Sequence, residues 1–354
     1  MIALAVLAIE LSPAHFLYTG PLLTAVPALA AVATGPKPTA AAVALTLAIS
    51  AITATYNQAW GTPQVYTNFL ALTLVSVASF ITSSAVRAYR RRELDQVRRI
   101  AVSAQEVILR PVPERLGPVR TASLCLVAGS EAQVGGDLYE AVHTRYGVRM
   151  IVGDVRGKGL SAMRAVATAL GAFRVVAHYE DDLVQVMNHC AAALRREVVV
   201  PGAYSEEVLL EGFTTALIAQ VPDDEPVVQL VNRGHPPPLI LHEGRTRPLL
   251  SASPLPPLGL EDLIPVPPER PESHPFVAGD RLLLYTDGVI EARNPDDTFF
   301  PLPQTMQSLS SLTPQDCLHQ LHQALIRHTE GHLADDVAMI LADRLDQGNG
   351  IPVI

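Results

Sequence analysis

The first 86 residues of this 354-residue chain contain almost no charge. Glu10 and Lys37 are the only residues with formally charged side chains in that stretch. Charged residues make up 17% of the whole chain, against about 25% in soluble domains. Because the deficit is concentrated at the N-terminus, that part of the chain does not resemble a soluble domain.

The chain is also poor in cysteine and has no excess of basic residues. Cys125, Cys190 and Cys317 lie far apart, so they suggest neither a disulfide framework nor a CxxC metal site. This pattern fits a reducing compartment for the C-terminal part. The formal net charge is -9, and we expect no binding to nucleic acid, which favours a basic face.

What the N-terminal part has instead is long apolar runs. Residues 39–56 and 66–86 are uncharged and close to the ~20 residues that a membrane-spanning helix needs. Residues 2–35 are apolar too, but prolines interrupt them. They form either two shorter segments, roughly 2–18 and 19–35, or one kinked segment. Region 1–86 is therefore predicted to contain three or four membrane helices.

A cluster of arginines follows the second uncharged run. It comprises Arg87, Arg90, Arg91, Arg92, Arg98 and Arg99. Positive residues next to a membrane span favour the cytoplasmic side. A cleaved signal peptide is not favoured, because no basic region precedes the first apolar run. We therefore predict a multi-pass protein of the cell membrane whose following domain is cytoplasmic.

Residues 87–111 are predicted to be a linker helix that continues from the membrane. Apolar residues recur along it at spacings of three and four, at Leu94, Val97, Ala101, Ala104 and Ile108. That spacing is typical of a coiled-coil seam of about two heptads, and it predicts a homodimer through this helix. A helix that packs on its own domain is the alternative.

From residue 118 to residue 345 the composition is that of a soluble domain, followed by a tail at 346–354. Alternation and helical spacing predict strands and helices there. Strands are expected at 121–129, 138–143, 148–153, 213–221, 227–232, 238–243, 281–286 and 336–342, and helices at 160–179, 182–198 and 314–330. Asp181 is the expected cap of the second helix. The proline-rich segment 252–275 is expected to be a surface loop. Strands grouped apart from paired helices indicate an α+β sandwich.

The most informative stretch is a predicted hairpin between Val134 and Gly159. Its turn, at residues 145–147, would place Asp137 opposite Asp154, and glycines flank both. Two adjacent carboxylates repel each other unless a cation or a proton lies between them. The simplest chemistry is a hard divalent metal, although two loop aspartates in glycine-rich turns remain an alternative.

Further carboxylates stand at predicted strand ends. Asp287 follows an apolar strand, and Asp335 and Asp336 precede the last strand. Such a set of oxygen ligands favours Mg²⁺ or Mn²⁺ over Zn²⁺. His235 is tempting as a base but is interpreted as structural. The sequence has neither a GxSxG nucleophile elbow nor a Walker A loop.

Seven short motifs occur in one order. They are GGD at 135–137, GDVRGKG at 153–159, FTTAL at 213–217, NRGHPPPL at 232–239, PLGL at 257–260, GDRLLLYTDGVIEARN at 279–294 and ADDVAMI at 334–340. Together they closely resemble the bacterial SpoIIE/RsbU-type branch of the metal-dependent, protein phosphatase 2C-like (PPM) serine/threonine phosphatases. The resemblance covers about residues 104–344.

The resemblance implies a four-layer αββα sandwich with a centre of two Mn²⁺ or Mg²⁺ ions. Carried over by motif, the catalytic metal ligands would be Asp137, Asp154 and Asp287, with the Val155 carbonyl as a further ligand. Asp335 matches the family's last ligand best, and Asp336 is the close second. Two departures are Arg233, where a small residue is common, and Asp297-Thr298, which replaces a usual glycine.

The resemblance also implies a function. The family's substrates are phosphoserine or phosphothreonine proteins, typically STAS-type anti-anti-sigma factors, and hydrolysis uses metal-activated water. The expected protein is therefore a membrane-anchored serine/threonine phosphatase. The alternative is a catalytically weak, membrane-bound scaffold of the same fold that binds a regulatory partner. The sequence does not distinguish Mn²⁺ from Mg²⁺.

Overall fold

The computed structural model describes residues 20–33, 35–128, 135–198, 213–260 and 269–346. Contacts divide the chain into two units, Met1–Val97 and Arg98–Ile354. The predicted boundaries at 86 and 118 therefore do not coincide with the division between the units. The separation into membrane region, linker, phosphatase-like domain and tail stays a prediction.

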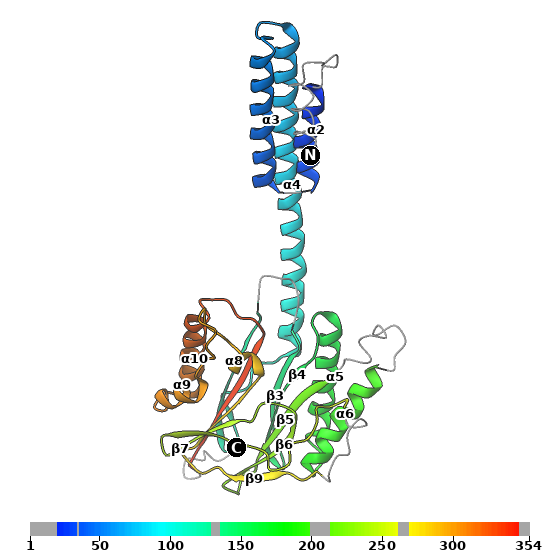
Figure 1. Cartoon of the computed structure of the whole chain (residues 1–354). Coiled ribbons are helices and arrows are strands. Elements are labelled where there is room, and N and C mark those ends of the chain that lie inside the picture. Colours follow the sequence, from blue (N-terminus) through cyan, green and yellow to red (C-terminus); the bar gives the residue numbers. More distant parts are fainter. Residues whose placement is uncertain (1–19, 34, 129–134, 199–212, 261–268, 347–354) are drawn as a thin grey trace. The chain divides into compact units, whose positions relative to one another are not determined.

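The described part of the N-terminal unit is helical. It contains the 3₁₀ helix η1 (Gly20–Thr24), α2 (Ala25–Ala33), α3 (Pro36–Tyr56) and the first part of α4 (Pro63–Ile108) (Figure 1). Two stretches are long and apolar enough to span a membrane, Lys37–Tyr56 and Pro63–Arg90. They contain the predicted runs 39–56 and 66–86. The predicted segment 2–18 lies outside the described residues.

Helix α4 is unbroken over its 46 residues. The predicted continuation from the second apolar run into the linker is therefore confirmed. The helix ends at Ile108, shortly before Pro111, whose ring disfavours helical backbone at the preceding residue. The side chains of Leu94, Val97, Ala101 and Ala104 lie outside the described part of the structure, so the seam stays a prediction.

Two antiparallel sheets form the C-terminal unit. The six-stranded sheet has the order β1-β2-β11-β10-β7-β8, and the five-stranded sheet has the order β3-β4-β5-β6-β9. The first contains β1 (Arg115–Leu116), β2 (Val119–Leu126), β7 (Leu239–His242), β8 (Arg245–Pro248), β10 (Arg281–Tyr285) and β11 (Val337–Arg344). The second contains β3 (Asp137–Thr144), β4 (Gly147–Val155), β5 (Thr214–Val221), β6 (Val227–Arg233) and β9 (Glu272–Pro275).

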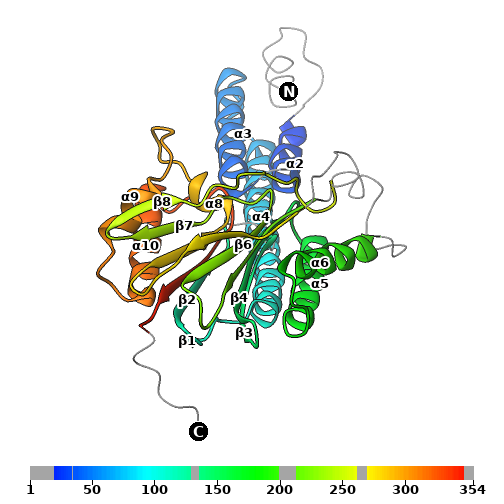
Figure 2. The ribbon, with the colours of Figure 1, turned by 90° about the horizontal axis from the view of Figure 1, so that it is seen from below.

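Helices cover the outer face of each sheet (Figures 1 and 2). Helices α5 (Leu160–Val176) and α6 (Leu183–Val198) contact the five-stranded sheet. Helices α9 (Leu302–Ser308) and α10 (Pro314–His328) contact the six-stranded sheet. Strand β11 packs against β3 and β4 across the middle of the sandwich. The expected αββα arrangement is confirmed.

The structure corrects two local expectations. The expected cap Asp181 is not the capping residue, because the side chain of its neighbour Asp182 accepts the bond from the backbone N–H of Val184, at 2.8 Å. The expected loop 252–275 contains a strand, β9, which pairs with β6. Its sequence, ESHP, lacks the apolar alternation by which strands are predicted.

Candidate metal centre

The β3–β4 hairpin brings two of the candidate aspartates together. Asp137 is the first residue of β3 and pairs in register with Asp154, near the end of β4. The predicted hairpin and its register are confirmed. Asp137 is only 3% exposed, whereas Asp154 is half-buried. The hairpin therefore presents two carboxylates at one edge of the five-stranded sheet.

Two glycines before Asp137 make room for the neighbouring oxygens. A Cβ at Gly135 would lie 1.2 Å from Oδ2 of Asp336, and one at Gly136 would lie 2.0 Å from the carbonyl oxygen of Val155. No side chain fits at such distances. The GGD motif thus lets the backbone approach both Asp336 and the Val155 carbonyl, and three chain segments meet here.

The fourth segment comes from the end of β10. Asp287 is the first residue of the short helix α8 (Asp287–Ile290). A Cβ at its neighbour Gly288 would lie 1.8 Å from the carbonyl oxygen of Asp336. Asp335 is half-exposed, and its Oδ1 accepts a bond from the Asp336 N–H at 3.0 Å. The structure therefore brings all six candidate ligands to one edge of the sandwich.

The negative charges of these carboxylates raise one another's pKa values. Burial raises the pKa of Asp137 well above its usual value, and the charge of Asp154 raises it further. Burial, followed by the charges of Asp287, Asp335 and Asp336, raises the pKa of Asp154 to about 7. Burial also raises the pKa of Asp287 and that of Asp336. Such mutual repulsion is relieved by a proton or by a cation.

The donor set fits a hard divalent ion. Within the described residues, no three His, Cys, Asp or Glu side chains converge closely enough to hold one ion by themselves. Paired carboxylates with a backbone carbonyl suit Mg²⁺, which usually keeps several water ligands. The glycine cradle at Gly135 and Gly136 keeps the space beside Asp336 and Val155 free of side chains.

Thr286 is a part of the site that the sequence did not single out. It is fully buried, and its hydroxyl donates to Oδ2 of Asp137 at 2.9 Å. The same hydroxyl accepts the N–H of Ala338 at 2.9 Å. Thr286 thus links Asp137, in the five-stranded sheet, to β10 and β11 of the six-stranded sheet. In the sequence, its position directly before Asp287 in the YTDG motif could have indicated that it belongs to the site.

His235 is structural, as interpreted from the sequence. Its Nδ1 lies 3.0 Å from the Thr215 hydroxyl, and its Nε2 lies 3.0 Å from the carbonyl oxygen of Tyr285. Burial lowers the pKa of His235 to about 4, so the imidazole is neutral at pH 7. Because Nε2 must donate to the carbonyl, Nδ1 accepts from Thr215. His235 therefore ties β5 to β10.

We expect His235→Ala to lower the melting temperature and to reduce phosphate release far less than loss of a candidate metal ligand. The change leaves the buried Tyr285 carbonyl without its bond, at a cost of about 1–3 kcal/mol. Thermal unfolding and turnover of the same preparation check this. Complete loss of turnover at an unchanged melting temperature would assign His235 a direct chemical role.

The two departures noted in the sequence are explained structurally. Arg233 makes a bidentate ion pair with Glu269, at 2.6 Å between Nη2 and Oε2, and both side chains are at most 7% exposed. Asp297 has φ +62°, a conformation that favours glycine but that aspartate tolerates better than most residues. Arg293 pairs with it at 2.7 Å. Neither departure touches a candidate ligand.

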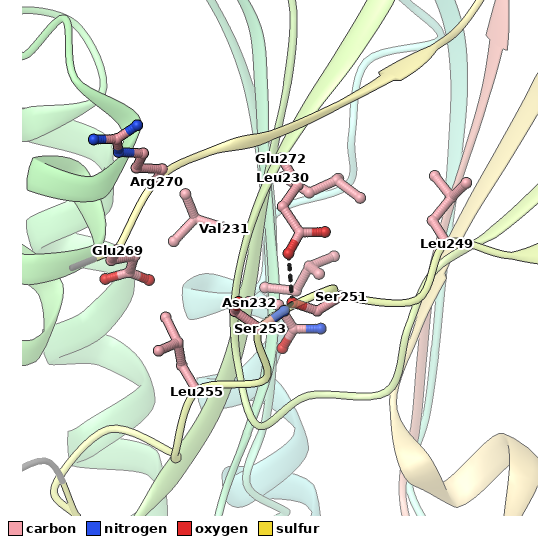
Figure 3. A pocket seen from close by; sticks show the side chains of 11 residues that line it. Leu230, Val231, Asn232, Leu249, Ser251, Ser253, Leu255, Glu269, Arg270 and Glu272 are labelled. Atoms are coloured by element: carbon pink, nitrogen blue, oxygen red, sulfur yellow. Dashed lines mark hydrogen bonds between the residues drawn. The ribbon is translucent and has the colours of Figure 1, made fainter. Parts of the chain in front are cut away.

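A small hollow of about 50 Å³ is lined in part by Glu269, the ion-pair partner of Arg233 (Figure 3). Glu269, Asn232 and Leu255 are among the residues that line it. On its far side Ser251 donates to Glu272 at 2.6 Å, which holds the chain after β8 against β9. None of the candidate metal ligands belongs to its lining, so this hollow is separate from the carboxylate cluster.

Comparison with known proteins decides the family. The family described as Stage II sporulation protein E (SpoIIE) matches residues 144–345, more than half of the chain. The chain belongs to the SpoIIE family. The match includes Asp154, Asp287, Asp335 and Asp336, and begins just after Asp137.

Two relatives of this SpoIIE-family chain are similar to it over 60% of its length. The phosphoserine phosphatase RsbP of Bacillus subtilis (strain 168) is 26% identical over 218 residues, which are 50% of RsbP. The protein IcfG of Synechocystis is 25% identical over 234 residues, which are 36% of IcfG. The chain thus spans half or less of the length of these relatives.

Solved structures show the same fold. The PP2C domain of SiaA from Pseudomonas aeruginosa superposes with a TM-score of 0.57 at 17% identity, covering 73% of this chain and 99% of that one. The RsbU and RsbW domains of a Mycobacterium tuberculosis protein give 0.55 at 24% identity, covering 67% and 62%. The SpoIIE-family domain described here therefore has the PP2C phosphatase fold.

Proposed function

We propose that this chain is a metal-dependent protein serine/threonine phosphatase. The observation that carries the proposal is the meeting of Asp137, Asp154, Asp287 and the Asp335-Asp336 pair at one edge of a PP2C-fold sandwich. Family membership and the similarity to the phosphoserine phosphatase RsbP support it.

We assign two Mn²⁺ or Mg²⁺ ions to this centre. Their ligands would be Asp137, Asp154, the Val155 carbonyl, Asp287 and Asp335, with Asp336 beside them. When bound, such ions lower the pKa of a water molecule and neutralise phosphate charge. The chain's own residues arrange the site. Thr286 fixes the orientation of Asp137, and the Ala128 N–H holds Oδ1 of Asp336 at 2.7 Å.

The direct test is phosphate release by the purified full-length chain in detergent. We expect hydrolysis of a phosphoserine or phosphothreonine peptide with Mn²⁺ or Mg²⁺ and none after chelation. Metal binding without hydrolysis of any phosphopeptide would instead favour the partner-binding scaffold. The proposed substrate class is a phosphorylated STAS-type anti-anti-sigma factor, which is tested by offering such a protein beside the generic peptide.

The localisation we propose is the cell membrane, with the phosphatase domain in the cytoplasm. Two helices can span a bilayer, and large apolar side chains such as Leu70, Leu74 and Ile81 are exposed on α4. The arginines from Arg87 onward would then lie on the cytoplasmic side. Protease added to intact cells should spare the domain, whereas protease added to lysed cells should digest it. Digestion in intact cells would reverse the orientation.

We also propose that the chain pairs through the linker part of α4. A seam of about two heptads is marginal in solution, but two copies in one membrane are concentrated relative to each other. We expect an Ala101→Cys variant to crosslink in membranes, and Leu94→Asp with Val97→Asp to prevent this. The parent chain without the new cysteine is the control. If Ala101→Cys gives no crosslink, the helix is only a spacer.

A further inference from the structure

One cation already lies at the candidate metal centre. The ammonium nitrogen of Lys158 is 3.3 Å from Oδ1 of Asp335. Its positive charge also lowers the pKa of Asp154 and that of Asp336, which counteracts part of the increase caused by burial. A divalent ion that binds to Asp335 would therefore meet a lysine already paired with that carboxylate.

Glycines in open space flank Lys158 on both sides. Gly157 and Gly159 flank the lysine with φ of +113° and +85°, and nothing lies within 4 Å of the position of a Cβ at either one. Side chains of Lys158 and Asp335 are 48% and 50% exposed. An exposed pair of this kind is weak and is easily exchanged for another partner.

Arg156, a second cation in the same loop, contacts Phe213. The guanidinium of Arg156 lies 5.1 Å from the centre of the Phe213 ring, and the Arg156 N–H donates to the Phe213 carbonyl at 3.0 Å. Lys158 and Arg156 thus carry the same charge two residues apart, and Lys158 makes the ion pair with the candidate ligand Asp335.

We propose that Lys158 is a positioning residue that changes partner: it holds Asp335 until a divalent ion binds there, and then binds the phosphoryl group of the substrate. The proposal rests on the proposed phosphatase function. An ammonium and a divalent ion at the same carboxylate oxygen repel each other, so Lys158 leaves when the ion arrives. A lysine released at this edge is a point charge suited to a phosphate.

The first measurement is metal binding by the full-length chain, followed through the electron paramagnetic resonance signal of free Mn²⁺. We expect Lys158→Gln to tighten the weaker Mn²⁺ site by roughly threefold to tenfold. Arg156→Gln is the matched control and should leave both sites unchanged. In an Asp335→Asn background, Lys158→Gln should have a smaller effect, because the Lys158–Asp335 pair is already lost.

The second measurement is binding of inorganic phosphate to the Mg²⁺-loaded chain, followed by phosphorus NMR line width. Lys158→Gln should weaken phosphate binding by roughly threefold to tenfold, and Lys158→Arg should restore it. Unchanged Mn²⁺ affinity in Lys158→Gln, an equal shift in Arg156→Gln, or unchanged phosphate binding would each overturn the proposal. Neither measurement needs turnover. A chain that binds Mn²⁺ and inorganic phosphate as expected but hydrolyses no phosphopeptide would therefore refute only the phosphatase function.

Discussion

Replacement of Asp154 by Asn is expected to abolish metal-dependent phosphate release. The same result is expected for Asp137→Asn and Asp287→Asn, since each change removes a charged oxygen ligand while keeping the shape of the side chain. The loss should exceed the roughly 10- to 100-fold effect of losing a group that merely orients a ligand. Turnover with saturating Mn²⁺ measures it.

These variants should remain folded. In the metal-free protein the pKa of Asp154 is raised to about 7, mainly by burial, so its ionised form costs stability at neutral pH. Asn removes that cost, and the melting temperature without metal should not fall. Asp296→Asn, on an exposed loop, is the control and should keep full activity. Normal turnover in any ligand variant would remove that residue from the site.

Gly136→Ala is expected to have the second large effect. The new Cβ would lie 2.0 Å from the carbonyl oxygen of Val155, which is backbone and cannot swing aside. The Val155 N–H also donates to the Gly136 carbonyl at 3.0 Å, so the hairpin end must open to make room. We expect Mn²⁺ affinity and turnover to fall by about 10-fold or more.

The control for this variant is Gly171→Ala, in the interior of α5, where a Cβ meets nothing within 4 Å. That substitution should leave activity unchanged and stabilise the chain by up to about 1 kcal/mol, because alanine is the better helix former. Isothermal titration with Mn²⁺ and thermal unfolding compare the two. Wild-type Mn²⁺ affinity in Gly136→Ala would mean that the glycine is not needed for the centre.

Much of the centre could be predicted because it depends on local geometry. A strand period of two and a short turn fix which residues face each other in a hairpin, so Asp137 opposite Asp154 follows from spacing alone. The meeting of this pair with Asp287, Asp335 and Asp336 is different, since β10 and β11 belong to the other sheet. The position of these carboxylates at predicted strand ends suggested that they converge, and the family resemblance assigned them as ligands.

Other features depend on tertiary contacts that spacing does not encode. The role of Thr286 requires knowing that β10 ends beside both β3 and β11. The ion pair of Lys158 joins residues that are far apart in the sequence. Strands β8 and β9 were missed because RTRP and ESHP are short, polar segments held by pairing with their neighbours.

The Thr286 bridge has a thermodynamic consequence. Because it joins Asp137 to strands of the opposite sheet, the full ligand set exists only while both sheets are packed together. Divalent ions would then bind the native chain and not the unfolded one, so they act as folding ligands. At 100 times the dissociation constant, one such ion adds about 2.7 kcal/mol to the free energy of unfolding. Chelation would lower the melting temperature of the whole sandwich in a single cooperative transition.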